Sequence, residues 1–398
     1  MSSSAIPHPR EVLEPASTRA LVPTLARTRN PDVWVYRYTH TEHGWTLSIA
    51  THGVPGAGQL SLGGFRIAPA ARTDAPDWDD RREAIELAMG MEEKVHWSRV
   101  IRAGGPRGRE QVRGLVGGKC VLTPTPDARV GQPRDVALLD FALACFADFE
   151  AASGVRLNTG QDLGHGTLTN GVASLEYLSE RFHGAVSADT SKPTGEGNFS
   201  TLAGMLAASG VPLARARVAL VGCGNIGSWV LARLRDTGAE VVAIEAMPAK
   251  REQLAALGVD ARAADAKLAA LAEPLDAVVV NANGGSLDAA TCAVIAANAR
   301  VSVVCGSENL AMPDSTNEAR LRAAGKVYAP TEFGGMMGYL TAVEEYLARH
   351  AGQPFALSTM LQAATALEEA GRLATERVRA SGFAMSFEEA VTEVYAAR

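Results

Sequence analysis

The stretch RARVALVGCGNIGSWVLARLRDTGAEVVAIEA, residues 215–246, decides the fold of the second half of the chain. An apolar run is followed by a glycine-rich turn, then by a segment with helical spacing of its apolar residues, then by a second apolar run. This order predicts a strand, a helix and a second, parallel strand, which is the repeating unit of doubly wound sheets. We therefore expect an α/β protein with a parallel sheet in its C-terminal half.

Three glycines in this turn, Gly222, Gly224 and Gly227, match the G-x-G-x-x-G pattern of dinucleotide-binding folds. The first allows a tight turn, the second lets the backbone approach a pyrophosphate, and the third permits close packing of helix on strand. The predicted helix begins at Asn225 and Ile226, and its first amides would face the phosphates. The pattern predicts a Rossmann domain.

The second strand of this unit ends at Glu245, about 20 residues after the glycine turn. A carboxylate at this position accepts hydrogen bonds from a ribose 2′-hydroxyl and repels a 2′-phosphate, so the sequence predicts NAD as the cofactor. Lys250 and Arg251 follow closely and leave open a role in binding a phosphate.

Composition limits the class of protein. The chain has 398 residues, of which 47% are hydrophobic, and this length predicts two domains. A formal net charge of −6 and the absence of long apolar runs argue against nucleic-acid and membrane partners. The N-terminal segment lacks the apolar core of a signal peptide, and the 5 cysteines form no C-x-x-C pair. We expect a cytoplasmic protein with reduced thiols and no metal site.

The N-terminal half mixes strand and helix patterns. Residues 33–50 alternate apolar and polar side chains and predict two strands around the turn TEHG. Residues 98–113, rich in arginine and glycine, are interpreted as an exposed loop or an insertion. Helices are predicted over residues 78–95, 135–152, 198–209 and 356–397.

A lysine occupies an unusual place in this half. The stretch VGGKCVL, residues 116–122, brings Lys119 to the start of an apolar run that is typical of a buried strand. Moving an ammonium group out of water without a partner costs roughly several kcal/mol or removes its proton. Lys119 is therefore expected either to point into a cleft or to extend to the surface.

Eight short motifs follow one another along the chain: LGGFR (62–66), GMEEK (90–94), GGK (117–119), TGQD (159–162), TLAG (201–204), GCGNIG (222–227), GSEN (306–309) and YAP (328–330). In their order they resemble the motifs of the glutamate/leucine/phenylalanine/valine dehydrogenase family. The resemblance runs from Val35 to Leu347 and is closest to the leucine/phenylalanine branch, which acts on apolar amino acids.

The resemblance implies an α/β fold of two domains separated by a cleft. A substrate-binding and oligomerisation domain is expected at residues 1–192 and an NAD-binding Rossmann domain at residues 193–345. Helices at residues 346–398 are expected to return to the substrate domain.

The activity that the resemblance implies is the reversible, NAD-dependent oxidative deamination of an L-amino acid to the 2-oxo acid and ammonia. Lys119 and Asp162 would be the catalytic residues, and Lys94 with the backbone amides of Gly63 and Gly64 would bind the substrate carboxylate. Burial and a neighbouring cation, for which Lys94 is the candidate, would lower the pKa of the catalytic lysine toward neutrality.

Further cofactor contacts are expected from four polar residues. Thr201 and Asn309 resemble positions that bind the nicotinamide side, and Asn281 and Asn283 follow a predicted strand at its carboxyl end. Simpler interpretations stay open: threonine and asparagine commonly cap helices, an aspartate can cap a loop, and a glycine pair can form a plain turn.

Two departures from the family pattern concern the substrate. Gly335, in the segment TEFGGMMGYL (331–340), stands where the family has an asparagine that binds the substrate amino group. The arginine-rich segment 98–113 lengthens the chain between Lys94 and Lys119. We therefore expect a non-standard or bulky amino acid as substrate.

Two alternative functions remain. One is a reductive aminase or imine reductase of specialised biosynthesis, and the other is an NAD-binding regulatory protein without turnover. The resemblance also suggests a homo-oligomer, a dimer or higher, for which Trp34, Tyr36 and Tyr38 could provide an edge strand.

Overall fold

The computed structural model describes residues 8–397, which group into two compact units. The first unit contains the chain up to His96, Pro106–Thr190 and Tyr339–Phe355, and the second contains Trp97–Gly105, Ser191–Gly338 and the chain from Ala356 onward. The helices after Ala356 thus group with the second unit, whereas the sequence assigned residues 346–398 to a return to the substrate domain.

The first unit is built on a seven-stranded sheet of order β1-β2-β3-β6-β4-β7, with β5 paired to β6. The pairs β1–β2, β2–β3 and β3–β6 are antiparallel, whereas β4 and β5 each lie parallel to β6, and β4 lies parallel to β7. The strands are β1 (Arg10–Leu13), β2 (Trp34–Thr39), β3 (Thr46–Thr51), β4 (Leu60–Leu62), β5 (Phe65–Ile67), β6 (Leu115–Thr123) and β7 (Arg156–Asn158).

The predicted strand pair in residues 33–50 is confirmed as β2 and β3. The expectation that β2 is an edge strand is wrong, because β1 pairs with it along its outer side. Tyr36 and Tyr38 are accordingly buried. Strand β1 has only 4 residues, too few for an alternation pattern to reveal it.

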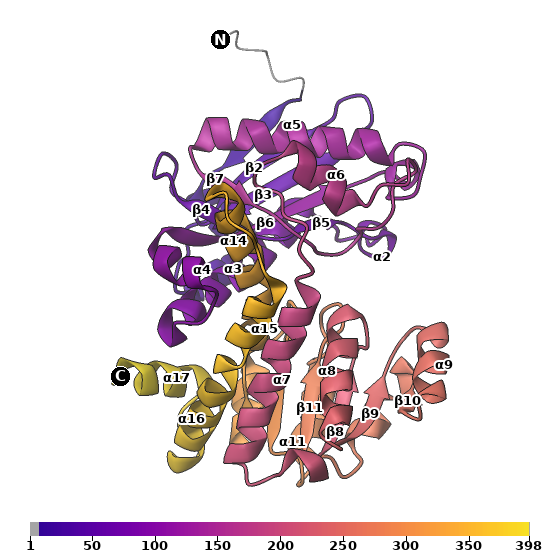
Figure 1. The fold of residues 1–398 in the computed structure, drawn as a ribbon, viewed down its shortest axis with the longest axis vertical. Helices are drawn as coiled ribbons and strands as arrows, with labels where there is room; N and C mark the ends of the chain where they lie inside the picture. The colour runs from indigo at the N-terminus through magenta and orange to yellow at the C-terminus, as the bar shows by residue number, and fades with distance from the viewer. Residues whose placement is uncertain (1–7, 398) are drawn as a thin grey trace. The chain divides into compact units, whose positions relative to one another are not determined.

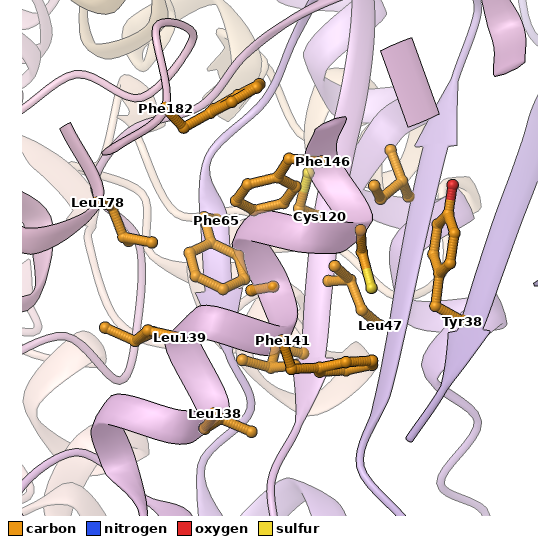
Figure 2. Packing of buried hydrophobic residues seen from close by; sticks show 14 of the residues in the cluster. Tyr38, Leu47, Phe65, Cys120, Leu138, Leu139, Phe141, Phe146, Leu178 and Phe182 are labelled. Atoms are coloured by element: carbon orange, nitrogen blue, oxygen red, sulfur yellow. The ribbon is translucent and has the colours of Figure 1, made fainter. Parts of the chain in front are cut away.

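Helices cover both faces of this sheet. Figure 1 shows α5 lying along the sheet of the first unit, and its apolar residues pack against those of the strands in the core drawn in Figure 2. The helices of this unit are α1 (Pro15–Leu21), α2 (Ala70–Thr73), most of α3 (Asp80–Ile101), α4 (Pro106–Gln111), α5 (Asp135–Ser153), α6 (Ser174–Arg181) and most of α14 (Met336–His350).

The opposite face of the sheet is covered by α3. The Ser48 hydroxyl donates to the Asp80 carboxylate at 2.7 Å, and the Gly117 amide donates to the Glu92 carboxylate at 2.6 Å. Since successive side chains of a strand point to opposite faces, β6 sends Cys120 into the core beneath α5. The lysine that precedes it therefore points to the α3 face.

The interpretation of residues 98–113 as an exposed loop is wrong. Residues 98–101 complete α3 and residues 106–111 form α4. Arg102 has φ 55° and Gly104 has φ 118°, so a short left-handed turn separates the two helices. Proline at the first position starts α4, and Glu344 of α14 accepts the amide hydrogen of Gly108 at 2.9 Å.

The second unit has a six-stranded parallel sheet of order β10-β9-β8-β11-β12-β13. Numbered within the unit this is the order 3-2-1-4-5-6 of the doubly wound dinucleotide fold. The strands are β8 (Arg217–Val221), β9 (Glu240–Ile244), β10 (Asp260–Arg262), β11 (Ala277–Val280), β12 (Val303–Gly306) and β13 (Val327–Tyr328). The predicted strand–helix–strand unit is confirmed as β8, α8 and β9.

The helices of the second unit include the predicted C-terminal ones. Helices α7 and α16 pack closely, and two glycines permit this approach. A Cβ on Gly204 would overlap Glu368 O, and one on Gly371 would approach Thr201 O. The helices are α7 (Ser191–Ala208), α8 (Asn225–Asp236), α9 (Pro248–Ala256), α10 (Lys267–Leu271), α11 (Ala289–Ala297), α12 (Thr316–Ala323), α13 (Thr331–Gly334), α15 (Leu357–Ala364), α16 (Ala366–Ala380) and α17 (Phe387–Ala396).

Three further properties concern the described residues, 8–397. No helix in this range has the length and apolar character needed to cross a membrane. All the cysteines are buried and none is in a disulfide. Within the same residues, no group of three or more His, Cys, Asp or Glu side chains is arranged to hold a metal ion.

Candidate active site and dinucleotide site

Lys119 and Asp162 form a buried ion pair in the first unit. The Lys119 Nζ donates to Asp162 Oδ2, and the side chains are only 3% and 8% exposed. Lys119 comes from β6, and Asp162 lies in the segment that follows β7. The structure thus brings together, across 43 positions of sequence, the two residues that the motifs GGK and TGQD single out.

Arg66, which sequence reasoning missed, joins this pair. Its Nη2 lies 3.2 Å from Asp162 Oδ1, and its Nη1 lies 2.6 Å from Glu83 Oε1 of α3. Arg72 forms a second ion pair with Glu83. The motif LGGFR contained the signal for Arg66. An arginine between two apolar residues of a buried strand needs a partner for its charge, just as Lys119 does.

Burial and charge shift the pKa values of this cluster. Burial lowers the pKa of Lys119; the Asp162 carboxylate opposes this shift, Arg66 adds to it, and the net pKa lies below the ordinary lysine value. Burial alone would raise the pKa of Asp162, but Arg66 and Lys119 hold it well below its usual range. Arg66 is therefore a neighbouring cation of the kind expected to lower the pKa of Lys119, a role for which Lys94 was the candidate. Lys94 is itself buried on α3.

Gly63 and Gly64 separate β4 from β5 beside this pair. A Cβ on Gly63 would overlap Gly118 O, whereas one on Gly64 would lie 3.0 Å from Lys119 Nζ and 3.2 Å from the Asp162 side chain. The Gly63 amide donates to Asn158 O at 3.2 Å, and within residues 8–397 the amide of Gly64 has no such bond. The Gly64 backbone thus lies close to the ammonium group of Lys119.

The glycine loop of the second unit has the geometry that a pyrophosphate needs. Gly222 has φ 86°, which allows the tight turn after β8. Gly224 is the N-cap of α8, and a Cβ there would meet no atom within 4 Å. A Cβ on Gly227 would overlap Gly222 O, so that position requires glycine for packing. Asn225 and Ile226 form the first turn of α8, whose amides face this open space.

Glu245 follows β9 and contacts the glycine loop. Its Oε2 accepts the amide hydrogen of Cys223 at 2.8 Å, and its Oε1 accepts that of Met247 at 2.9 Å. Arg251 donates instead to the backbone carbonyls of Glu245 and Ala246. The guanidinium is thereby engaged, while each carboxylate oxygen keeps a lone pair for a ribose hydroxyl.

Asn281 follows β11 directly and carries an unsatisfied donor. Its Oδ1 accepts from Asn198 Nδ2 at 2.7 Å and from Ser307 Oγ at 2.6 Å, while its Nδ2 is buried without a partner in the described chain. A buried donor left unpaired costs about 1–3 kcal/mol. This amide is therefore placed to donate to a ligand at the carboxyl end of the sheet.

Glu308, of the GSEN motif, holds the loop that follows Asn281, and sequence reasoning missed it. Its carboxylate accepts the amide hydrogens of Ala282 and Ser286, both at 2.9 Å, and the residue is 2% exposed. Asn283 is exposed on this loop. An acidic residue two positions after a buried strand was the available signal.

The remaining expected residues also lie in the second unit. Thr201 is fully buried in α7, and its hydroxyl donates to Gly197 O at 2.9 Å within the same helix. Asn309 follows β12, and its carbonyl oxygen lies 3.5 Å from the Cβ position of Gly284. Gly335 is the C-cap of α13 and is buried.

The comparisons with known proteins agree with this architecture. Residues 222–328 match the family described as homoserine dehydrogenase, NAD binding domain. A search of curated proteins by sequence finds no match.

Three solved structures illustrate the similarity of fold. L-tryptophan dehydrogenase from Nostoc punctiforme is 17% identical with a TM-score of 0.60, and the match covers 91% of this chain and 95% of that one. The hetero-hexameric glutamate dehydrogenase from Thermus thermophilus is 16% identical with a TM-score of 0.63, covering 98% and 88%. Glutamate dehydrogenase from Plasmodium falciparum is 12% identical with a TM-score of 0.62, covering 96% and 84%. The chain therefore has the fold of the amino acid dehydrogenases, the family that its motifs resemble, and carries a nicotinamide dinucleotide-binding domain.

Proposed function

We propose that the protein catalyses the reversible, NAD-dependent oxidative deamination of an L-amino acid. The observation that carries the proposal is the buried pair of Lys119 and Asp162 beside Gly64, in a chain that also contains a dinucleotide-binding unit. In the balanced reaction, amino acid, NAD⁺ and water give 2-oxo acid, ammonium, NADH and one proton.

The residues of the second unit fit a bound dinucleotide. The open space at Gly224 and the first amides of α8 would hold the pyrophosphate, and Glu245 would accept hydrogen bonds from a ribose. The Asn281 Nδ2 would donate to the nicotinamide half. A carboxylate at position 245 would repel a 2′-phosphate, which favours NAD over NADP. When bound, the cofactor supplies the hydride acceptor.

Lys119 would move the protons of the reaction. As a neutral amine it accepts a proton from the water that attacks the imine carbon, and as an ammonium it stabilises the carbonyl oxygen that forms. Its lowered pKa makes both states accessible. Asp162 would accept a hydrogen bond from the substrate amino group, and Lys94 with the Gly64 amide would bind the substrate carboxylate.

The substrate is proposed to be bulky or non-standard. Gly335 supplies no side chain where the family pattern has an asparagine, and it is buried. If position 335 meets the substrate as the family resemblance implies, this chain would lack one polar contact to the substrate amino group and would leave room for a larger substrate.

A homo-oligomer is also proposed. Strand β1 lies at the end of the sheet order, so within residues 8–397 one of its edges has no strand neighbour, and Val12 on it is 42% exposed. Sedimentation velocity of the purified protein tests this; a single species at monomer mass would contradict it.

The activity is tested by incubating the protein with NAD and a panel of L-amino acids that includes bulky and non-standard ones. Formation of the reduced cofactor is followed by absorbance, and the reverse direction is followed with 2-oxo acids and ammonium. Turnover of at least one substrate is expected. Dinucleotide binding without turnover in either direction would favour the regulatory-protein alternative, and activity confined to reductive amination of other carbonyl compounds would favour the reductive aminase.

The role of Lys119 is tested with Lys119→Ala. Loss of a general acid–base group lowers kcat by about 10²–10⁴-fold. The matched control is Lys326→Ala, because Lys326 is also a buried lysine, donating to Asn298 O at 2.6 Å in the second unit. The control is expected to lose stability but not turnover per folded molecule. Activity of Lys119→Ala within about tenfold of the parent would refute the mechanism.

A further inference from the structure

Arg66 lies between two buried carboxylates, one from the segment after β7 and one from α3. We infer that Arg66 is a positioning residue that holds half of the Asp162 carboxylate away from Lys119, so that the lysine can release its proton. This inference rests on the proposed catalytic role of Lys119 and adds a second residue to that site.

The geometry divides the carboxylate between two cations. Asp162 Oδ2 accepts from Lys119, while Oδ1 lies 3.2 Å from Arg66 Nη2 and accepts the Leu163 amide hydrogen at 2.6 Å. Without the guanidinium, both oxygens would be available to the ammonium group. A tighter ion pair would then favour the protonated lysine.

Glu83 keeps the guanidinium in place. Its Oε1 lies 2.6 Å from Arg66 Nη1, and the two side chains are 3% and 7% exposed. The planar fork of arginine can bind one carboxylate on each side at the same time, which an ammonium group cannot do with a fixed geometry. Because Glu83 comes from α3, the helix that covers this face of the sheet also fixes the charge next to Lys119.

The charges of the cluster balance without the lysine. The guanidinium groups of Arg66 and Arg72 match the carboxylates of Asp162 and Glu83. A proton on Lys119 is therefore a surplus positive charge in a buried place, and such a charge is costly. The cluster is neutral when the lysine is neutral.

Two other titratable groups lie near the lysine: His165, and Cys120, whose side chain points to the opposite face of the sheet. His165 is held by Phe65 O at 2.7 Å and Ser174 Oγ at 3.0 Å, and burial lowers its pKa. Burial raises the pKa of the neighbouring Cys120 thiol to about 12. Both groups are uncharged near neutral pH, so neither replaces Arg66, and Lys94 on α3 is buried as well. In agreement with the geometry, Arg66 lowers the pKa of Lys119.

Two substitutions are expected to act in opposite directions. Arg66→Gln removes the competing cation, so the pH at which Lys119 loses half its protons rises by about one unit or more, which is a tenfold change in proton affinity. Glu83→Gln removes a negative charge and leaves the guanidinium with Asp162, so this midpoint falls. A residue that only supports the fold would not produce shifts of opposite sign.

The midpoint is measured without turnover, by competitive acetylation of lysines with acetic anhydride over a range of pH. Mass spectrometry then reports the extent of labelling at Lys119. In the active enzyme, the acid limb of kcat/KM is expected to move in parallel, and Arg66→Lys is expected to restore part of the shift. Because labelling needs no substrate, absence of turnover would refute the proposed function and leave this measurement intact.

Arg37→Gln is the matched control. Arg37 also links the sheet to α3, with its Nε 3.1 Å from Asp80 Oδ2, and it has no contact with Asp162. This variant is expected to leave the Lys119 midpoint unchanged. An unshifted midpoint in folded Arg66→Gln would overturn the inference. If Arg66→Gln does not fold, an unchanged or raised midpoint in Glu83→Gln would overturn it.

Discussion

The carboxylate of Glu245 accepts a hydrogen bond from the backbone amide of Cys223 at 2.8 Å. The residue that follows the second strand of the dinucleotide unit therefore contacts the glycine loop that follows the first strand. One side chain would serve two purposes, because it would offer acceptors to a ribose and it already contacts the loop that would receive the pyrophosphate.

Glu245→Gln is expected to weaken NAD binding by about tenfold, or ~1.4 kcal/mol, because the side-chain amide retains only one acceptor oxygen for two backbone donors. Discrimination against NADP is expected to fall as well, since the negative charge is lost. Titrations of NADH and NADPH fluorescence measure both effects. Glu240→Gln is the control, because Glu240 begins the strand that Glu245 follows and pairs with Arg217 at the surface. Unchanged affinities for both cofactors would contradict the prediction.

Gly224→Ala is expected to lose dinucleotide affinity, whereas Gly227→Ala is expected to lose stability. At position 224 a methyl group meets no protein atom, so the free energy of unfolding stays near that of the parent while dinucleotide affinity drops about tenfold or more. At position 227 the methyl group overlaps Gly222 O, so stability falls by ~2 kcal/mol or more. Denaturant unfolding and cofactor titration separate the two. Equal losses of stability in both variants would show that the open space at Gly224 is not specific.

Gly64→Ala is expected to lower kcat with little loss of stability, because its methyl group would lie 3.0 Å from Lys119 Nζ and disturb the pair with Asp162. Gly63→Ala is expected to destabilise the fold, since its methyl group overlaps Gly118 O. Gly114→Ala, whose Cβ meets nothing within 4 Å, is the control. Steady-state kinetics and thermal unfolding measure the effects; a fully active Gly64→Ala would argue against the proposed site.

Stability is expected to rise with pH on the alkaline side because of Lys119. Its pKa is lowered in the folded state from the ordinary value of 10.5. Between these two values the unfolded chain holds a proton that the folded chain has lost, so the free energy of unfolding increases with pH in this window. The gain is ~1.4 kcal/mol for each unit of the shift.

The gain is measured as the difference between the parent and Lys119→Met in urea unfolding at several pH values between neutrality and the ordinary lysine pKa. The methionine variant keeps the length of the side chain and removes the titration. Parallel curves for the two proteins would mean that the lysine has an ordinary pKa in the folded state.

Local sequence signals account for the part of the fold that was predicted. The strand, glycine turn and helix around Gly222 are contiguous, and each of them follows from propensity and periodicity alone. The motifs also single out Lys119 and Asp162, which the structure places in contact, and their catalytic roles stay predictions until they are tested.

The parts that sequence reasoning missed depend on distant residues. The contact between Arg66 and Asp162 joins positions 96 apart, and the capping of α4 by Glu344 joins positions more than 200 apart. Arg102 adopts a positive φ that is rare outside glycine, so a pattern of arginines and glycines does not reveal the two helices that it separates. None of these features produces a periodic pattern of residues in the sequence, so a search for such patterns does not find them.

Three close approaches lie beside the lysine, two before it in β6 and one from the segment between β4 and β5. A Cβ on Gly117 would overlap the backbone of α3 at Glu92, one on Gly118 would overlap the Ser61 hydroxyl, and one on Gly63 would overlap Gly118 O. The backbone that carries Lys119 is thus packed tightly at positions without side chains, so few side chains beside it can change rotamer. Engineering of the substrate range can accordingly vary side chains outside the charged cluster of Lys119. Gly63, Gly117 and Gly118 must be kept in every variant that is to hold Lys119 in this position.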